Sequence, residues 1–183
     1  MLRIALVGKN KAAKTWAGNY LKEKHKFTHK RLGDPVENFV KNTFYYLGRE
    51  RGKVFSWSQK LAIYDYLYKM RPDIWVGLME ERMKTQQKDA VVSDVRYIDE
   101  LEFLRDKVGF TIVRVHAPPP RLTNVTQALG REYASGTLYL AEMYAKDFTE
   151  TIRADHSITF DPKNRQPAKD ALNALVKTWR REI

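Results

Sequence analysis

Short apolar runs alternate with helical patterns along this chain of 183 residues. The first run, Leu2 to Val7, is followed at once by Gly8, and a helical pattern extends from Thr15 to Lys24. A continuous apolar run that ends at a glycine is typical of a buried parallel strand. Strands that alternate with helices predict an α/β fold of three layers, in which helices cover both faces of a central parallel sheet.

The later elements continue this alternation. Further strands are predicted near residues 27–32, 88–95, 110–115 and 157–160, which gives a sheet of about five strands. Helices are predicted near residues 36–47, 58–69, 72–86, 99–108 and 167–180. We expect one domain with a core of residues 1–33, 88–118 and 151–183, a helical region at 34–87 and a lid at 119–150. Ligands of such sheets bind beyond the carboxyl ends of the strands, so functional residues should lie there.

Charge and cysteine content narrow the classes of function. The chain has 33 Lys and Arg against 22 Asp and Glu, a net charge of +11, which suggests an anionic partner. A nucleic acid, an anionic membrane surface or a small polyphosphate would each fit this charge. The absence of cysteine from the sequence excludes disulfides, thiolate nucleophiles and cysteine-based zinc sites. The early apolar run is far shorter than the roughly 20 residues that span a bilayer, so we expect a cytoplasmic location and no membrane partner.

Residues 8–15 match the phosphate-loop pattern G-x-x-x-x-G-K-[ST], except that Ala13 stands where glycine is expected. In such loops backbone N–H groups wrap a phosphate, a lysine reaches its terminal oxygens and a hydroxyl joins the Mg²⁺ shell. Lys14 and Thr15 fill the last two roles. At positive φ the Ala13 methyl would cost about 1–2 kcal/mol, whereas helical dihedrals would make it harmless. The alternative is an ordinary basic turn between a strand and a helix. The predicted donor-nucleotide site consists of Gly8, Lys9, Asn10, Lys11, Ala12, Ala13, Lys14 and Thr15.

A second motif follows the apolar pair Val91-Val92. Residues Ser93 to Glu102 read Asp-Val-Arg, then an aromatic residue, then an acidic pair at a helix start. This segment resembles the phage-type deoxynucleoside monophosphate kinases, a branch of the phosphate-loop kinases, although Asp99 stands where that family usually has Asn. Arg71 to Val76 is similar to the family's segment ending in Trp-Val, and Gly33-Asp34-Pro35 is similar to the start of its helical block. The similarity runs in order over most of the chain.

The resemblance implies an enzyme that uses ATP and Mg²⁺ to convert deoxynucleoside monophosphates into diphosphates for DNA precursor synthesis. Its partners would be small-molecule nucleotides, in the host cytoplasm if the protein is viral, and a homodimer stays open. An acceptor phosphate with a second pKa near 6 is largely dianionic at pH 7, so no strong general base is needed. Cations are needed instead, to hold two phosphates that repel each other. The basic charge balance fits that need.

The motifs suggest roles for individual side chains. Arg121 and Arg131 could close over the transferred phosphoryl group from the lid, or could be solvated loop residues. Asp94 could hold Mg²⁺ through water or bind the acceptor, or could cap a helix. The predicted catalytic residues are Lys14, Arg121, Arg131 and Asp94, and the predicted metal ligands are Thr15 and Asp94. The predicted acceptor site consists of Asp34, Arg71, Trp75, Asp94, Arg96 and Glu100.

Two other functions compete with this prediction. A non-catalytic nucleic-acid-binding protein would also use basic and aromatic residues, but the chain has no arginine-rich arm and no known binding module. A phosphate-loop kinase for another small phosphorylated metabolite would share the same physics. Four aromatic residues in the helical block could stack on a base or pack in the core: Trp75, Phe44, Tyr45 and Tyr64. The four histidines show no metal-ligand spacing and are expected to be packed or solvated.

Overall fold

The computed structural model describes residues 1–8, 13–35, 57–71, 73–95, 97–117 and 153–182, together with positions 38 and 42. Within these residues five strands form one sheet: β1 (Arg3–Val7), β2 (Thr28–Lys30), β3 (Ala90–Val92), β4 (Thr111–His116) and β5 (His156–Thr159). The helices are α1 (Lys14–His25), α3 (Trp57–Met70), α4 (Ile74–Lys84), α5 (Ile98–Asp106) and α8 (Gln166–Glu182). All neighbouring strands are parallel, in the order β2-β3-β1-β4-β5. The predicted α/β fold is confirmed.

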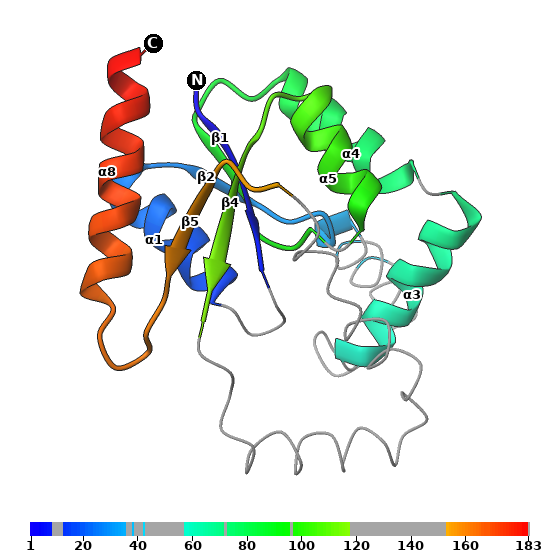
Figure 1. Ribbon diagram of the computed structural model, residues 1–183. Coiled ribbons are helices and arrows are strands. Elements are labelled where there is room, and N and C mark those ends of the chain that lie inside the picture. The colour runs from blue at the N-terminus through cyan, green and yellow to red at the C-terminus, as the bar shows by residue number, and fades with distance from the viewer. Residues whose placement is uncertain are drawn as a thin grey trace.

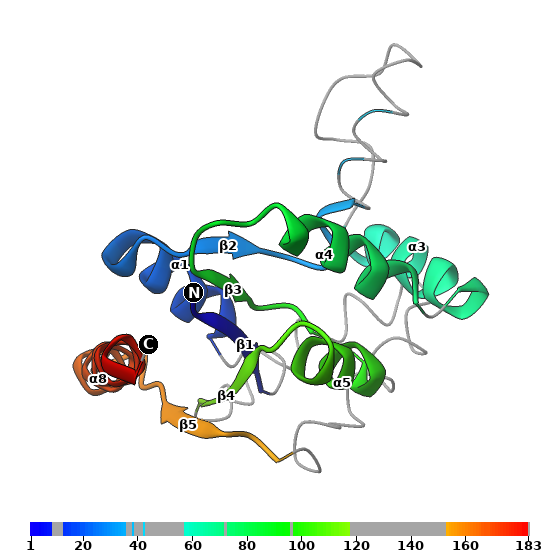
Figure 2. The same ribbon diagram turned by 90° about the horizontal axis from the view of Figure 1, so that it is seen from above.

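Helices cover both faces of the sheet. Helices α1 and α8 lie on one face, and α3, α4 and α5 lie on the other (Figures 1 and 2). Two separate apolar cores result. The core under α1 and α8 includes Leu6, Leu21 and Leu172, whereas the core under α3, α4 and α5 includes Val7 and Met79.

Burial on both faces explains why the central strand β1 is apolar from Ile4 to Val7. Ile4 and Leu6 pack into the core under α1 and α8, and Ala5 and Val7 pack into the core under α3, α4 and α5. Each of these four side chains is 0–1% exposed. A strand buried on both faces has no position for a polar side chain, which is why it reads as a run rather than an alternation.

Helix α1 is bounded by two residues in the left-handed region. Ala13 has φ 59° and ψ 20° at its start, and Lys26 has φ 65° and ψ 24° at its end. The Lys26 N–H bonds to the Leu21 carbonyl, which satisfies one of the last carbonyls of the helix. Neither position is glycine, so both carry the steric cost of a side chain at positive φ.

Element boundaries differ from the predicted ones by a few residues. Helix α4 begins at Ile74 rather than residue 72, with Asp73 as its N-cap. Helix α8 continues to Glu182, beyond the predicted end at residue 180. Asp34 and Pro35 are helical, as expected of a helix start. The predicted helix at residues 36–47 and the predicted lid at 119–150 lie outside the described residues, and the division into core, helical region and lid stays a prediction.

Among the residues that the structure describes, no helix is both long enough and apolar enough to cross a membrane.

Candidate active site at the carboxyl edge of the sheet

The register of the strands brings the two predicted motifs to one edge of the sheet. Ala5 of β1 is aligned with Val92 of β3, and Val7 of β1 is aligned with Arg114 of β4. Gly8 directly follows β1 and Ser93 directly follows β3, so both loops leave the sheet at its carboxyl edge. The chain runs from β1 to β2 on one side and from β3 to β4 on the other, which makes β1 a topological switch point where α/β proteins bind ligands.

The loop after β1 starts and ends in conformations that L-residues rarely adopt. Gly8 has φ 147° and Ala13 has φ 59°. The Lys14 Nζ donates a hydrogen bond of 2.5 Å to the Gly8 carbonyl, so the lysine reaches back across the loop to its start. Ala13 therefore lies in the left-handed region. Of the two conformations considered above, this is the one that costs about 1–2 kcal/mol, not the helical one. Lys9, Asn10, Lys11 and Ala12 lie outside the described residues.

The start of α1 fits an anion. Ala13 occupies the N-cap position and makes no side-chain cap, and the first turn contains no acidic residue. The N–H groups of a helix start carry partial positive charge and need acceptors, which phosphate oxygens supply. Lys14 adds a full positive charge there, and the Thr15 side chain is exposed. These residues suit the terminal phosphates of a nucleotide.

Asp94 joins the end of β3 to the turn after β2. Its Oδ1 accepts a hydrogen bond of 2.7 Å from the Leu32 N–H, and its Oδ2 accepts one of 2.9 Å from the Gly33 N–H. The alternative role as a helix cap does not apply, because Tyr97 is the N-cap of α5. The roles of Asp94 toward Mg²⁺ and acceptor stay predictions.

The donor set suits Mg²⁺ better than a metal that needs a full protein cage. The described residues contain no group of three or more His, Cys, Asp or Glu side chains that could hold a metal ion. Mg²⁺ commonly keeps several waters and binds through one or two protein ligands plus substrate phosphates. Thr15 and Asp94 could supply such a set.

A half-buried polar contact that sequence reasoning missed links α1 to this edge. The His29 ring on β2 lies between two partners, with Nδ1 2.9 Å from Asn19 Oδ1 and Nε2 2.7 Å from Ser93 Oγ. Burial lowers the pKa of His29, with the Asp94 carboxylate as the main opposing influence. The neutral ring therefore bridges α1 and the residue that precedes Asp94. Its sequence signal was weak, because a lone histidine in a polar stretch shows no pattern.

Two tyrosines of α3, Tyr64 and Tyr68, contact the start of α5, where Tyr97, Asp99 and Glu100 lie. Glu100 is 0% exposed; it accepts hydrogen bonds from the Tyr64 hydroxyl and, at 3.1 Å, from the Tyr97 N–H. The Tyr97 ring stacks on Tyr68 with centroids 3.6 Å apart and planes 5° apart. The Tyr68 hydroxyl donates to Asp99 at 2.5 Å, and burial and this bond raise the pKa of Tyr68. Glu100 thus orients Tyr97, and its direct contact with an acceptor stays a prediction. Tyr64, 1% exposed, is a core residue.

Two other predicted acceptor residues have partners close in sequence. The Arg71 Nε lies 3.0 Å from Asp73 Oδ1, and the Arg71 side chain is 73% exposed. This pair lowers the pKa of Asp73. Asp34 accepts hydrogen bonds from the Arg31 N–H at 3.1 Å and from the Arg31 Nε at 2.8 Å. The structure ties both residues to their own turns rather than to Lys14 or Asp94.

The remaining predicted residues are not described at the level that their roles require. Trp75 belongs to α4, and its side chain is outside the described part. Three predicted residues lie entirely outside the described part of the chain: Arg96, Arg121 and Arg131. Their roles stay predictions.

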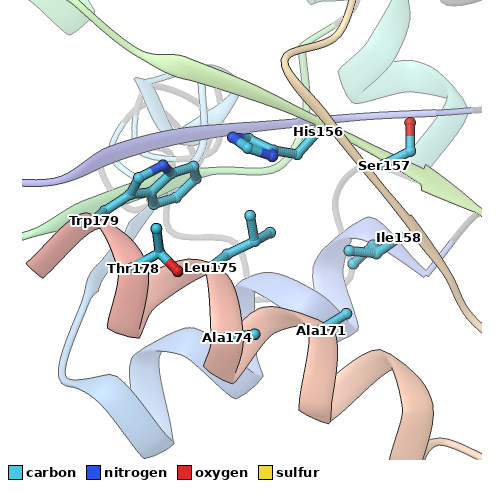
Figure 3. Close-up of a pocket in the computed structure, with 8 residues that line it drawn as sticks. All are labelled: His156, Ser157, Ile158, Ala171, Ala174, Leu175, Thr178 and Trp179. Atoms are coloured by element: carbon cyan, nitrogen blue, oxygen red, sulfur yellow. The ribbon is translucent and has the colours of Figure 1, made fainter. Parts of the chain in front are cut away.

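A separate hollow lies between β5 and α8 (Figure 3). It has a volume of about 330 Å³ and is mostly apolar, with Ala171, Leu175 and Trp179 of α8 on one side. The His156 ring of β5 packs edge-on against Trp179, with centroids 5.1 Å apart. None of its lining residues comes from the loops after β1 or β3, so it is not part of the candidate active site.

Comparison with solved structures supports the fold. Models of protein families give no match to the sequence, and curated proteins give none either. The shikimate kinase of Aquifex aeolicus is 16% identical with a TM-score of 0.51, over 97% of this chain and 98% of that chain. A gluconokinase of Sinorhizobium meliloti is 14% identical with a TM-score of 0.48, over 99% and 97% of the two chains. The shikimate kinase of Bacteroides thetaiotaomicron is 15% identical with a TM-score of 0.48, over 98% of each chain. The sheet order, the loop after β1 and the first of these likenesses agree that this chain has the fold of the phosphate-loop (P-loop) kinases.

Proposed function

We propose that this protein is an ATP-dependent phosphotransferase and that its acceptors are deoxynucleoside monophosphates. The observation that carries the proposal is the β1–loop–α1 unit, in which Lys14 reaches back to Gly8 at the uncapped start of a helix. This unit stands at the switch point of the sheet, next to Asp94. The resemblance of residues 93–102 to the phage-type enzymes supports the acceptor class.

On the donor side, the chain's own residues bind and orient phosphate oxygens. Lys14 would exchange its hydrogen bond to the neutral Gly8 carbonyl for one to a donor phosphate, which is stronger because both partners are charged. Thr15 and Asp94 would hold Mg²⁺, which when bound neutralises charge on the donor phosphates. The N–H groups at the start of α1 supply further fixed dipoles that need no reorganisation during the reaction.

On the acceptor side, the proposal relies on side chains that are fixed in position rather than on a general base. The Tyr97–Tyr68 stack and the buried Glu100 fix the start of α5 beside Asp94. His29 is held in place by Asn19 and Ser93, and the lowering of its pKa by burial favours the neutral ring. A dianionic acceptor phosphate is already a competent nucleophile, so positioning and charge neutralisation suffice.

The test is ADP formation from Mg-ATP with each deoxynucleoside monophosphate in turn, including 5-hydroxymethyl pyrimidine nucleotides. We expect turnover with one or a few acceptors and its loss in Lys14→Ala. Lys24→Ala is the matched control, because Lys24 belongs to the same helix and its side chain is exposed. Turnover in Lys14→Ala equal to that of the unmodified chain would contradict the assignment of the phosphate loop.

Two further arms separate the competing functions. Shikimate, the substrate named for the Aquifex aeolicus neighbour, and a panel of phosphorylated metabolites test another acceptor on the same fold. Turnover with one of these and with no nucleotide would keep the phosphotransferase and replace the acceptor class. Salt-dependent binding of a labelled oligonucleotide without any ATP binding would favour the nucleic-acid-binding alternative.

A further inference from the structure

We infer that Arg114 of β4 binds the oxyanion of the acceptor substrate, and that it is a substrate-binding residue of the candidate active site. The inference rests on the proposed phosphotransferase function and adds a residue that the sequence motifs do not include. Its position in the sheet, the face to which it belongs and the chemistry of a half-buried guanidinium support it independently of those motifs.

The register of the sheet places Arg114 beside the phosphate loop. Arg114 is aligned with Val7 of β1, the residue immediately before Gly8, and with Ser157 of β5. Continuing the pairing of Ala5 with Val92 by two residues aligns Val7 with Asp94. Neighbouring strands lie about 4.8 Å apart, so Arg114 is one strand from the loop and two strands from Asp94.

Side chains alternate between the two faces of a strand, which places Arg114 on the same face of the sheet as the Tyr97–Tyr68 stack. Ile112 packs into the core under α3, α4 and α5, whereas Val113 and Val115 pack into the core under α1 and α8. Arg114 therefore belongs to the face of Ile112 and Val7, which α3, α4 and α5 cover (Figure 2). The Tyr97–Tyr68 stack is part of the same face.

Arg114 interrupts the apolar stretch of β4. The other residues from Ile112 to Val115 are apolar and buried, and a parallel strand covered on both faces normally has apolar residues throughout such a stretch. The Arg114 side chain is half-buried and its Nε atom is buried. A residue that departs from the pattern of its element is expected at functional sites, and a guanidinium keeps its charge when buried and binds phosphate or carboxylate through two parallel hydrogen bonds.

These observations give the proposed acceptor site a positively charged side chain, Arg114, on the β4 side of the loop after β1. Lys14 and the start of α1 face the donor from the loop itself. Arg114 belongs to the face covered by α3, α4 and α5, to which the Tyr97–Tyr68 stack also belongs, and we expect a small acceptor to bind on this side of the sheet edge. In this position its charge would attract an acceptor phosphate or carboxylate toward the donor and offset the repulsion between the two anions.

The experiment compares Arg114→Met and Arg114→Lys with the unmodified chain. Methionine fills the space of the side-chain stem without charge, and lysine keeps the charge without the planar pair of donors. We expect KM for the acceptor to rise about 10- to 100-fold in Arg114→Met, the range of a lost charge-assisted hydrogen bond, and less in Arg114→Lys. The Kd for Mg-ATP should change less than twofold in both variants.

Arg105→Met is the matched control. Arg105 is half-buried like Arg114, but it belongs to the last turn of α5 and donates to the Arg153 carbonyl near the opposite edge of the sheet. The Arg105→Met variant should leave the KM for the acceptor unchanged. Thermal melting monitors folding, and if Arg114→Met does not fold, the inference is decided on Arg114→Lys. An acceptor KM within twofold of the unmodified chain in a folded Arg114 variant would overturn the inference, as would equal losses in acceptor and ATP binding.

Failure of the proposed function gives a different result. If the unmodified chain turns over no acceptor, the phosphotransferase proposal fails, and equilibrium binding in the presence of ADP then tests Arg114 directly. Weaker binding of deoxynucleoside monophosphates by Arg114→Met identifies a phosphate oxyanion, and weaker binding of shikimate identifies a carboxylate. Absence of binding of either compound to the unmodified chain would also overturn the inference.

Discussion

Replacing Ala13 by glycine should stabilise the protein, which is the reverse of the usual effect of glycine inside a helix. Ala13 has φ 59° and ψ 20°, a conformation in which an L-residue is strained by about 1–2 kcal/mol. Glycine removes this strain but gives the unfolded chain more freedom, which costs about 0.4–1 kcal/mol. The two effects leave a net gain in the free energy of unfolding of about 0–1.6 kcal/mol, with a central value of about 0.8 kcal/mol.

Urea unfolding followed by circular dichroism measures this gain. The midpoint should rise without a change in slope, because the exposed surface on unfolding stays the same. For a chain of this length the melting temperature should rise by about 1–4 °C. Ala13→Val should give the opposite result, because a β-branched side chain is the least compatible with positive φ.

Lys26→Gly provides a matched control at the other end of the same helix. Lys26 has φ 65°, so its replacement should give a similar gain in stability. It lies 12 residues beyond Lys14 in the sequence, so the Kd for Mg-ATP should not change. A loss of about 1 kcal/mol in Ala13→Gly, together with a gain in Lys26→Gly, would refute the left-handed conformation at position 13.

Three other substitutions test the contacts around the site. Gly18→Ala places a Cβ 2.6 Å from His29 Nε2 and should lower the free energy of unfolding by about 1–3 kcal/mol. The control Gly77→Ala should not lower it, because no atom lies within 4 Å of the added Cβ. Equal urea midpoints for the two variants would refute the close packing of Gly18 against His29. Because burial lowers the pKa of His29 below its ordinary value of 6.5, the unfolded state binds more protons below that pH, so stability should fall as the pH drops through about 6.5. His29→Gln should lack that part of the decrease in urea titrations at several pH values, and an unchanged profile would contradict it. Glu100→Gln should cost about 1–3 kcal/mol, since an amide leaves one buried partner of the carboxylate unsatisfied; a neutral effect would indicate a protonated carboxyl group.

The fold could be predicted from the sequence because its strands are either long apolar runs or short runs between clear breaks. The central strand Arg3–Val7 was the clearest of these, since it is buried on both faces. The order of strands could not be predicted, because it depends on pairings between residues far apart in the chain. Helix ends differ from the predicted ones by a few residues at Ile74 and Glu182, because an apolar period shows which face of a helix is buried but not the residue at which the helix begins or ends.

The candidate site could be predicted only where a motif names residues that are close in sequence. Gly8, Lys14 and Thr15 form one such group, and the structure places Lys14 against Gly8. The contact of His29 with Ser93 joins two strands and has no local signature. Arg114 was not singled out either, because a single cation in a strand pattern gains meaning only from its register with Val7.

The central place of β1 has a consequence for the order of events during synthesis and folding. Ile4 pairs with Val91 on one side and with Thr111 on the other, so neither neighbour of the first strand is complete until about half of the chain has been made. Until then the apolar strand that leads into the phosphate loop has no sheet to enter. Such long-range pairing slows folding and leaves early segments open to association with other chains. Nascent chains that end before residue 111 should therefore aggregate, and the proposed nucleotide site should be among the last parts of the molecule to form.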